Sequence, residues 1–195
     1  MPLLDRTLLE RALSILGDEL STRGLRFAIV VVGGSALLLR DVTRRTTRDF
    51  DVMAIVDNGE YKKAEPMPIE LQEAARDIGE TLDIGPDWLN GKASGLLDFE
   101  LPKGFQARTE VRAYGALTVH IAGRADLIVL KLDAAVSEGP SSRHFSDLQA
   151  LKPSVDELLL AARWLTTAID SSPGFRTESV QALTALGVSD AEQRL

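Results

Sequence analysis

The chain has 195 residues and a formal net charge of -7, and 45% of its residues are hydrophobic. This is the size of one ordinary domain, or of one domain with a small helical appendage. The chain has no Cys, which excludes disulfides, thiolate zinc sites and thiol catalysis. It has only two His, which disfavours a histidine-based metal cluster. The acidic balance argues against sequence-blind binding to duplex nucleic acid. No apolar run approaches the roughly 20 residues of a membrane span, so we expect no membrane partner. The absence of Cys fits a reducing compartment, so we expect a cytoplasmic location.

The first predicted elements are a helix, a strand and a second helix. Apolar residues recur at helical spacing over 3–23, and a β-branched apolar run over 27–32 is typical of a buried strand. Gly33-Gly34-Ser35 interrupts this run, and helix formers follow over 36–40. Ser35 is the expected N-cap, and a helix start presents free N–H groups to an anion.

Two carboxylates mark the next predicted strand, over 49–56. Side chains alternate along a strand, so Asp49 and Asp51 face the same side, roughly 7 Å apart, while Phe50 and Val52 point into an apolar layer. Like charges on one face repel each other unless a cation lies between them. Beside a glycine turn, this pattern predicts a site for Mg²⁺ and a nucleoside triphosphate. The alternative is a solvated edge strand.

Arginines crowd the loop before these carboxylates, namely Arg40, Arg44, Arg45 and Arg48. They are interpreted either as a basic rim that holds a triphosphate or an acceptor nucleic acid, or as a solvated group paired with Asp41 and Asp49. The sequence leaves both interpretations open.

The remaining predicted elements follow in chain order: a helix over 69–82, a loop over 85–104, a hairpin of strands over 105–114 and 117–122, helices over 124–136 and 144–151, a helix from the capping box at Ser154 to about residue 168, and a short helix over 177–186. A loop as long as 85–104 inside a compact domain is usually either functional or wrongly assigned. Within it, Trp88 is expected to anchor the loop to the core rather than to stack on a base.

The stretch over 30–55 resembles the nucleotidyltransferase superfamily, whose signature is an apolar strand, Gly-Gly or Gly-Ser, a helix, and Asp-x-Asp on the next strand. Arg45-x-Thr47-x-Asp49-x-Asp51 is similar to the form found in the AbiEii-like branch. The resemblance and the predicted elements together imply an α/β fold with a small mixed sheet flanked by helices and a C-terminal helical cap. We expect a nucleotidyltransferase-like domain over 1–152 and a helical extension over 153–195 packed on it.

Two later helices resemble those of the AbiEii-type toxins, including the mycobacterial MenT group, in which a lysine and an aspartate complete the site. The matching residues are Lys131 and Asp147. The resemblance implies that Lys131 holds the triphosphate as a point charge, and that Asp147 orients this lysine or takes a proton from the acceptor hydroxyl. Ser146 stands where the family usually has Lys.

The resemblance implies transfer of an NMP from an NTP to an acceptor hydroxyl. Asp49 and Asp51 would hold Mg²⁺, and the triphosphate would contact Gly33, Gly34, Ser35, Arg45 and Thr47. The acceptor would be tRNA or a protein, as for a toxin, and an antitoxin protein would be a partner. One alternative is an adenylyltransferase of small molecules such as antibiotics. The other is a catalytically silent nucleotide-binding module, because the segment over 117–121 lacks the third strand carboxylate of many superfamily members.

Overall fold

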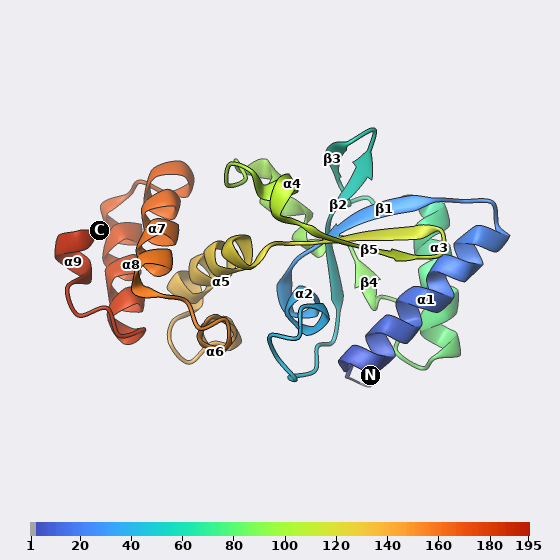
Figure 1. Ribbon diagram of the computed structural model, residues 1–195, viewed down its shortest axis with the longest axis horizontal. Helices are drawn as coiled ribbons and strands as arrows, with labels where there is room; N and C mark the ends of the chain where they lie inside the picture. The colour runs from blue at the N-terminus through green and yellow to red at the C-terminus, as the bar shows by residue number, and fades with distance from the viewer. Residues whose placement is uncertain (1–2) are drawn as a thin grey trace. The chain divides into compact units, whose positions relative to one another are not determined.

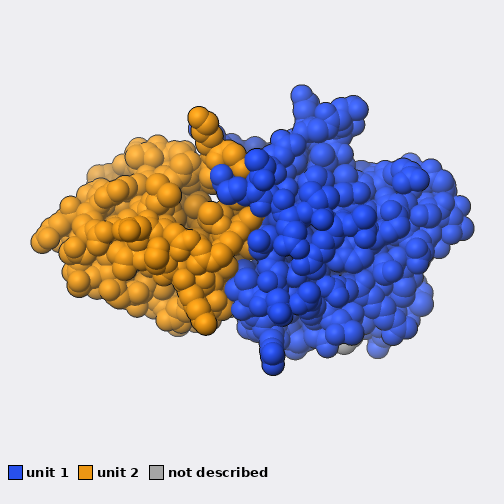
Figure 2. Space-filling model, in the orientation of Figure 1, with its two compact units in different colours: residues 1–101, 106–122 blue, residues 102–105, 123–195 orange. Residues whose placement is uncertain are grey.

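The computed structural model describes residues 3–195, which form two compact units (Figures 1 and 2). Unit 1 comprises Met1–Leu101 and Gln106–Ala122, and unit 2 comprises Pro102–Phe105 and Gly123–Leu195. A compact unit is defined by its internal contacts alone, so the expected domain boundary after residue 152 stays a prediction.

Unit 1 contains a mixed sheet with the strand order β3-β2-β1-β6-β5, and β4 pairs with β2 beside this path. β1 is antiparallel to β2 and parallel to β6. The predicted α/β class with a small mixed sheet is confirmed. The strands are β1 (Phe27–Val31), β2 (Phe50–Asp57), β3 (Glu60–Lys63), β4 (Leu89–Asn90), β5 (Glu110–Tyr114) and β6 (Leu117–Ile121).

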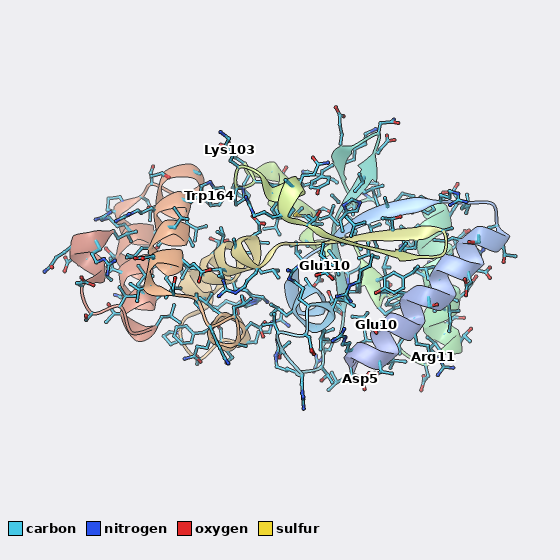
Figure 3. The ribbon with its side chains drawn as sticks, in the orientation of Figure 1. Asp5, Glu10, Arg11, Lys103, Glu110 and Trp164 are labelled. Carbon is cyan, nitrogen blue, oxygen red and sulfur yellow. The ribbon has the colours of Figure 1, made fainter. Side chains whose placement is uncertain are left out.

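Helices α1 and α2 cover one face of this sheet. α1 contacts β5 and β6, and α2 contacts β2. Arg112 of β5 ties both helices to this face, because its guanidinium donates to Glu10 of α1 at 3.3 Å and to the Leu39 carbonyl of α2 at 2.8 Å. Its Nε also donates to Glu110 at 2.8 Å, and Figure 3 labels both glutamates. The elements of unit 1 outside the strands are α1 (Arg6–Thr22), α2 (Gly33–Leu39), α3 (Ile69–Thr81) and η1 (Lys92–Asp98), and α4 (Phe105–Arg108) joins units 1 and 2.

The core of unit 1 lies on this helix-covered face. Arg112 pairs in register with Val119, which is fully buried, as are Leu117 and Ile121 on the same strand. The intervening residues Thr118 and His120 are only half-buried. Strand alternation therefore separates a helix-covered face from a second face, here called the open face of the sheet.

Several expected boundaries are wrong. Helix α2 begins at Gly33 with Val32 as its N-cap, so Ser35 is an interior residue rather than the cap. Residues at the start of the predicted hairpin form α4, β4 lies within the predicted loop over 85–104, and β3 is a strand that was not predicted. β3 and β4 lack a periodic pattern of their own, and their pairing with β2 decides their structure.

Unit 2 is helical. α5 contacts α6, α7 and α8, and the capping box at Ser154 begins α7 as predicted. α8 begins earlier than expected because Ser172 caps it and Pro173 occupies its first turn. Its elements are α5 (Arg124–Glu138), α6 (Arg143–Ala150), α7 (Val155–Trp164), η2 (Leu165–Ile169), α8 (Pro173–Ala185) and α9 (Ala191–Arg194). Over residues 3–195, no helix has the length and apolar character needed to cross a membrane.

Candidate active site

A glycine turn joins β1 to α2 and lies against the carboxylate of Asp51. Gly33 has a φ of +72°, and a Cβ built on it would lie 3.0 Å from Oδ2 of Asp51. This position therefore needs glycine both for its backbone conformation and for the close approach of a side chain from the next strand. The backbone N–H of Val32 also donates to the Asp51 carbonyl at 3.3 Å, which ties the turn to β2.

The two carboxylates lie at the start of β2. Asp51 is the second residue of the strand, and Asp49 immediately precedes it. Both are half-buried, whereas Phe50 and Val52 are fully buried. The predicted alternation of carboxylate and apolar side chains is therefore confirmed.

Thr47 connects the approach loop to this turn. Its backbone forms two hydrogen bonds with Leu4, of 2.7 and 2.9 Å, and its hydroxyl donates to the Asp49 carbonyl at 3.2 Å. A Cβ built on Gly34 would lie 3.3 Å from the Thr47 hydroxyl oxygen. Thr47, Gly33, Gly34 and Asp51 are thus brought together, although the sequence separates the turn from Asp51 by an entire helix and loop.

Ser35 has a different environment from the one expected. Its side chain is fully buried and its hydroxyl donates to the Val32 carbonyl at 3.2 Å. The hydroxyl is thus committed to the protein backbone inside α2. The predicted contact between this hydroxyl and phosphate is not supported, and we retain only the backbone N–H groups of the turn as candidate ligands.

The loop arginines divide into two groups. Arg40 pairs with Glu110 at 3.2 Å, and Asp41 pairs with Arg6 at 3.1 Å. Arg44, Arg45 and Arg48 are exposed, and over residues 3–195 Asp49 forms no ion pair with any of them. The interpretation that these arginines pair with Asp41 and Asp49 is therefore wrong. The backbone N–H of Arg45 donates a hydrogen bond to the Thr43 hydroxyl at 3.1 Å.

The sequence did not predict that β4 pairs with β2 beside Asp51, and Trp88 is the residue that holds β4 there. Trp88 is fully buried, its Nε1–H donates to the Ala75 carbonyl at 2.7 Å, and its ring lies 6.2 Å from that of Phe50. The predicted anchoring role of Trp88 is confirmed. This anchor holds β4 parallel to β2 and places Asn90 directly opposite Asp51 in register.

The other candidate residues, Lys131 and Asp147, lie in unit 2. Lys131 of α5 donates to Oδ2 of Asp147 of α6 at 2.8 Å, and both side chains are buried, with exposed fractions of 6% and 2%. His144 lies beside them, with Nδ1 at 3.4 Å from the lysine ammonium. Burial and the charge of Lys131 lower the pKa of His144. Lys131 is thus an internal residue rather than a lysine that reaches solvent.

The donor set of unit 1 suits Mg²⁺. Over the described residues, no group of three or more His, Asp and Glu side chains is arranged to hold a metal ion. Mg²⁺ needs no such cage, because it commonly binds one or two carboxylates together with substrate phosphates and water. Asp49 and Asp51 would supply this minimal set of hard oxygen ligands, and the turn beside them would offer backbone N–H groups to phosphate.

The fold and this group of residues define a class of α/β protein in which a glycine turn after the first strand meets paired aspartates on the second. A family model described as "Nucleotidyltransferase of unknown function (DUF6036)" matches residues 11–139. The chain belongs to this family, and the matched segment includes the turn, both aspartates and Lys131. Comparisons with the curated proteins and with the solved structures find no match.

Proposed function

We propose that this member of the nucleotidyltransferase family transfers an NMP from an NTP to an acceptor hydroxyl in a Mg²⁺-dependent reaction. The observation that carries the proposal is the position of Gly33 against the Asp51 carboxylate. Phosphate held by the turn and Mg²⁺ held by Asp51 would then be adjacent, as charge neutralisation during phosphoryl transfer requires.

Each candidate site residue of unit 1 has a defined role in this proposal. Asp49 and Asp51 hold Mg²⁺, which when bound neutralises the charge on the triphosphate oxygens. The backbone N–H groups at Gly33 and Gly34 contact phosphate, and Thr47 keeps the approach loop against Gly34. The exposed Arg45 adds positive charge on that loop.

Lys131 and Asp147 remain candidates from the resemblance to AbiEii-type enzymes. Their contact supports the predicted orienting role of Asp147, because its carboxylate accepts a hydrogen bond from the Lys131 ammonium. The Lys131 ammonium is a compact point charge of the kind that binds phosphate. We propose that Lys131 contributes to triphosphate binding and that Asp147 positions it.

We further propose a toxin-like role with tRNA or a protein as the acceptor and an antitoxin as partner. Support comes from the approach motif ending at Asp51 and from the exposed Arg44 and Arg48 on its loop. A small-molecule acceptor is the alternative, and the acidic net charge of -7 favours it.

The direct test incubates the purified protein with Mg²⁺, each labelled NTP in turn, and total RNA, a protein extract or aminoglycosides. Transfer of label identifies both the nucleotide and the acceptor class. Asp49→Asn and Asp51→Asn should each abolish transfer while leaving thermal unfolding nearly unchanged. Asp57→Asn is the matched control, because Asp57 lies on the same strand at its other end and pairs with Lys62. Transfer that survives Asp51→Asn, or that proceeds without Mg²⁺, would refute the proposal.

A further inference from the structure

The proposed reaction needs a group that accepts the proton of the attacking hydroxyl, and the strand that often supplies it lacks a carboxylate. In β6 the polar residues between the buried Leu117, Val119 and Ile121 are Thr118 and His120. Proton transfer in the transition state is usually carried out by histidine or by a carboxylate. His120 is therefore the residue on this strand whose chemistry suits the task.

The register places His120 on the same face of the sheet as Asp51. Val31 pairs with Val52 of β2 and with Ile121 of β6, and all three side chains are buried. Asp51 and His120 are each one residue away from this row along their own strands, so both side chains point to the open face. They are two strands and two rows apart, which separates their Cα atoms by roughly 12 Å.

The imidazole of His120 has no hydrogen-bond partner. Its Nδ1 is buried without a hydrogen bond, and over residues 3–195 no side-chain bond to His120 exists. Buried polar groups in folded proteins are nearly always paired, so this ring nitrogen is available to accept a hydrogen bond from a substrate hydroxyl. His144 provides the contrast, because both of its ring nitrogens have neighbours, Lys131 at 3.4 Å and Glu138 at 3.3 Å.

The surroundings keep His120 neutral. Burial alone lowers the pKa of His120. Its register neighbours on the open face are Val30 and Val111, and neither titrates. Charged groups on that face include Asp51 of β2 and Lys63 of β3, and Lys63 pairs with Asp98 of η1. A neutral imidazole has a lone pair with which to accept a proton at neutral pH.

We infer that His120 is the general base of the proposed transfer, in place of a third strand carboxylate. The imidazole takes the proton of the acceptor hydroxyl while the hydroxyl oxygen forms a bond to the α-phosphorus. The bond from the α-phosphorus to the bridging oxygen breaks, and pyrophosphate leaves with that electron pair. The imidazolium then releases its proton to water. This inference rests on the proposed function and deepens it.

The test compares the kcat, the affinity for Mg-NTP and the pH profile of His120→Asn, His120→Gln and His120→Asp. Removal of a general base typically costs roughly 10²–10⁴-fold in rate, so Asn and Gln should reduce kcat by this order while Mg-NTP binding stays unchanged. Two amide variants are used so that one folding defect does not decide the result. His120→Asp should recover part of the rate, with the acidic limb of its profile moved to lower pH, because a carboxyl titrates lower than an imidazole.

Thr118→Val is the matched control, because Thr118 lies on the same strand and the same face. It should leave kcat and the acidic limb unchanged. A His120→Asn protein as active as the wild type, or one that loses nucleotide binding in proportion to rate, would overturn the role of His120 while leaving the proposed function intact. A wild-type protein that transfers no nucleotide to any acceptor would instead overturn the proposed function, and this inference with it.

Discussion

Gly33, at the start of α2, lies so close to Asp51 of β2 that a side chain on Gly33 would press on its carboxylate, and this proximity joins the two halves of the candidate site. The Gly33 backbone has a φ of +72°, and a Cβ there would lie 3.0 Å from the Asp51 carboxylate oxygen. The position of the carboxylate therefore depends on the absence of a side chain one strand away.

Gly33→Ala should weaken Mg-NTP binding strongly, because the new methyl group displaces the Asp51 carboxylate. It should also reduce the free energy of unfolding by about 1–2 kcal/mol, the usual cost of left-handed backbone for a residue with a Cβ. Gly24→Ala is the matched control, since its φ is +69° and nothing lies within 4 Å of the added methyl group. Calorimetric titration and urea unfolding of both variants separate the two effects. Equal nucleotide affinity in both would show that the contact with Asp51 has no role in binding.

Trp88→Ala should reduce the free energy of unfolding by about 3–5 kcal/mol, because it empties a fully buried site beside Phe50. Trp88→Phe should cost about 1–2 kcal/mol, since a ring remains but the hydrogen bond to the Ala75 carbonyl is lost. Trp164→Phe, on α7 and half-buried, serves as the control and should change stability less (Figure 3). Urea unfolding provides the comparison. A Trp88→Ala protein of wild-type stability would contradict the anchoring role.

Lys131→Met or Asp147→Asn alone should destabilise the protein by about 3–5 kcal/mol, because each leaves an unpaired polar or charged group in a buried position. The double variant should lose less than the sum of the two. A double-mutant cycle measured by urea unfolding gives the coupling energy. Lys62→Met breaks an exposed pair and should have little effect. Additive losses in the cycle would mean that the buried pair does not couple.

The free energy of unfolding should fall as the pH is lowered from about 7 to about 5. The pKa of His144 is lowered in the folded protein by burial and by Lys131, so the unfolded chain binds the proton more readily. The contribution is fully present above the unfolded pKa of about 6.5, and is lost as the pH falls from there through the folded pKa. His144→Gln should flatten this dependence, and His120→Gln should flatten it further because burial also lowers the pKa of His120.

The free energy of unfolding is measured by urea titration at a series of pH values for variant and wild type. The difference between the two proteins at each pH cancels the contribution of the carboxylates that they share. A His144→Gln protein with the same slope as the wild type over this interval would contradict the prediction.

The local features of unit 1 were predictable from the sequence for a physical reason. The alternation of Asp49, Phe50, Asp51 and Val52 is a property of extended backbone, and the helical spacing before Gly24 is a property of the α-helix. The break at Gly33-Gly34 follows from the conformational freedom of glycine. Such patterns depend on residues close together in the chain, so the strands and helices that bear the motif were found with small errors at their ends.

The tertiary structure alone decided which groups meet. Asn90 lies opposite Asp51 because Trp88 is buried against Phe50 and α3. No sequence pattern in the loop over 85–104 predicts that pairing. The Ser35 hydroxyl is bonded to the Val32 carbonyl because α2 begins three residues earlier than expected. The face of His120 follows from strand register, which depends on hydrogen bonds between residues far apart in the chain. The sequence by itself thus determined the elements and the kind of chemistry they bear, whereas long-range packing decided which side chains lie within reach of one another.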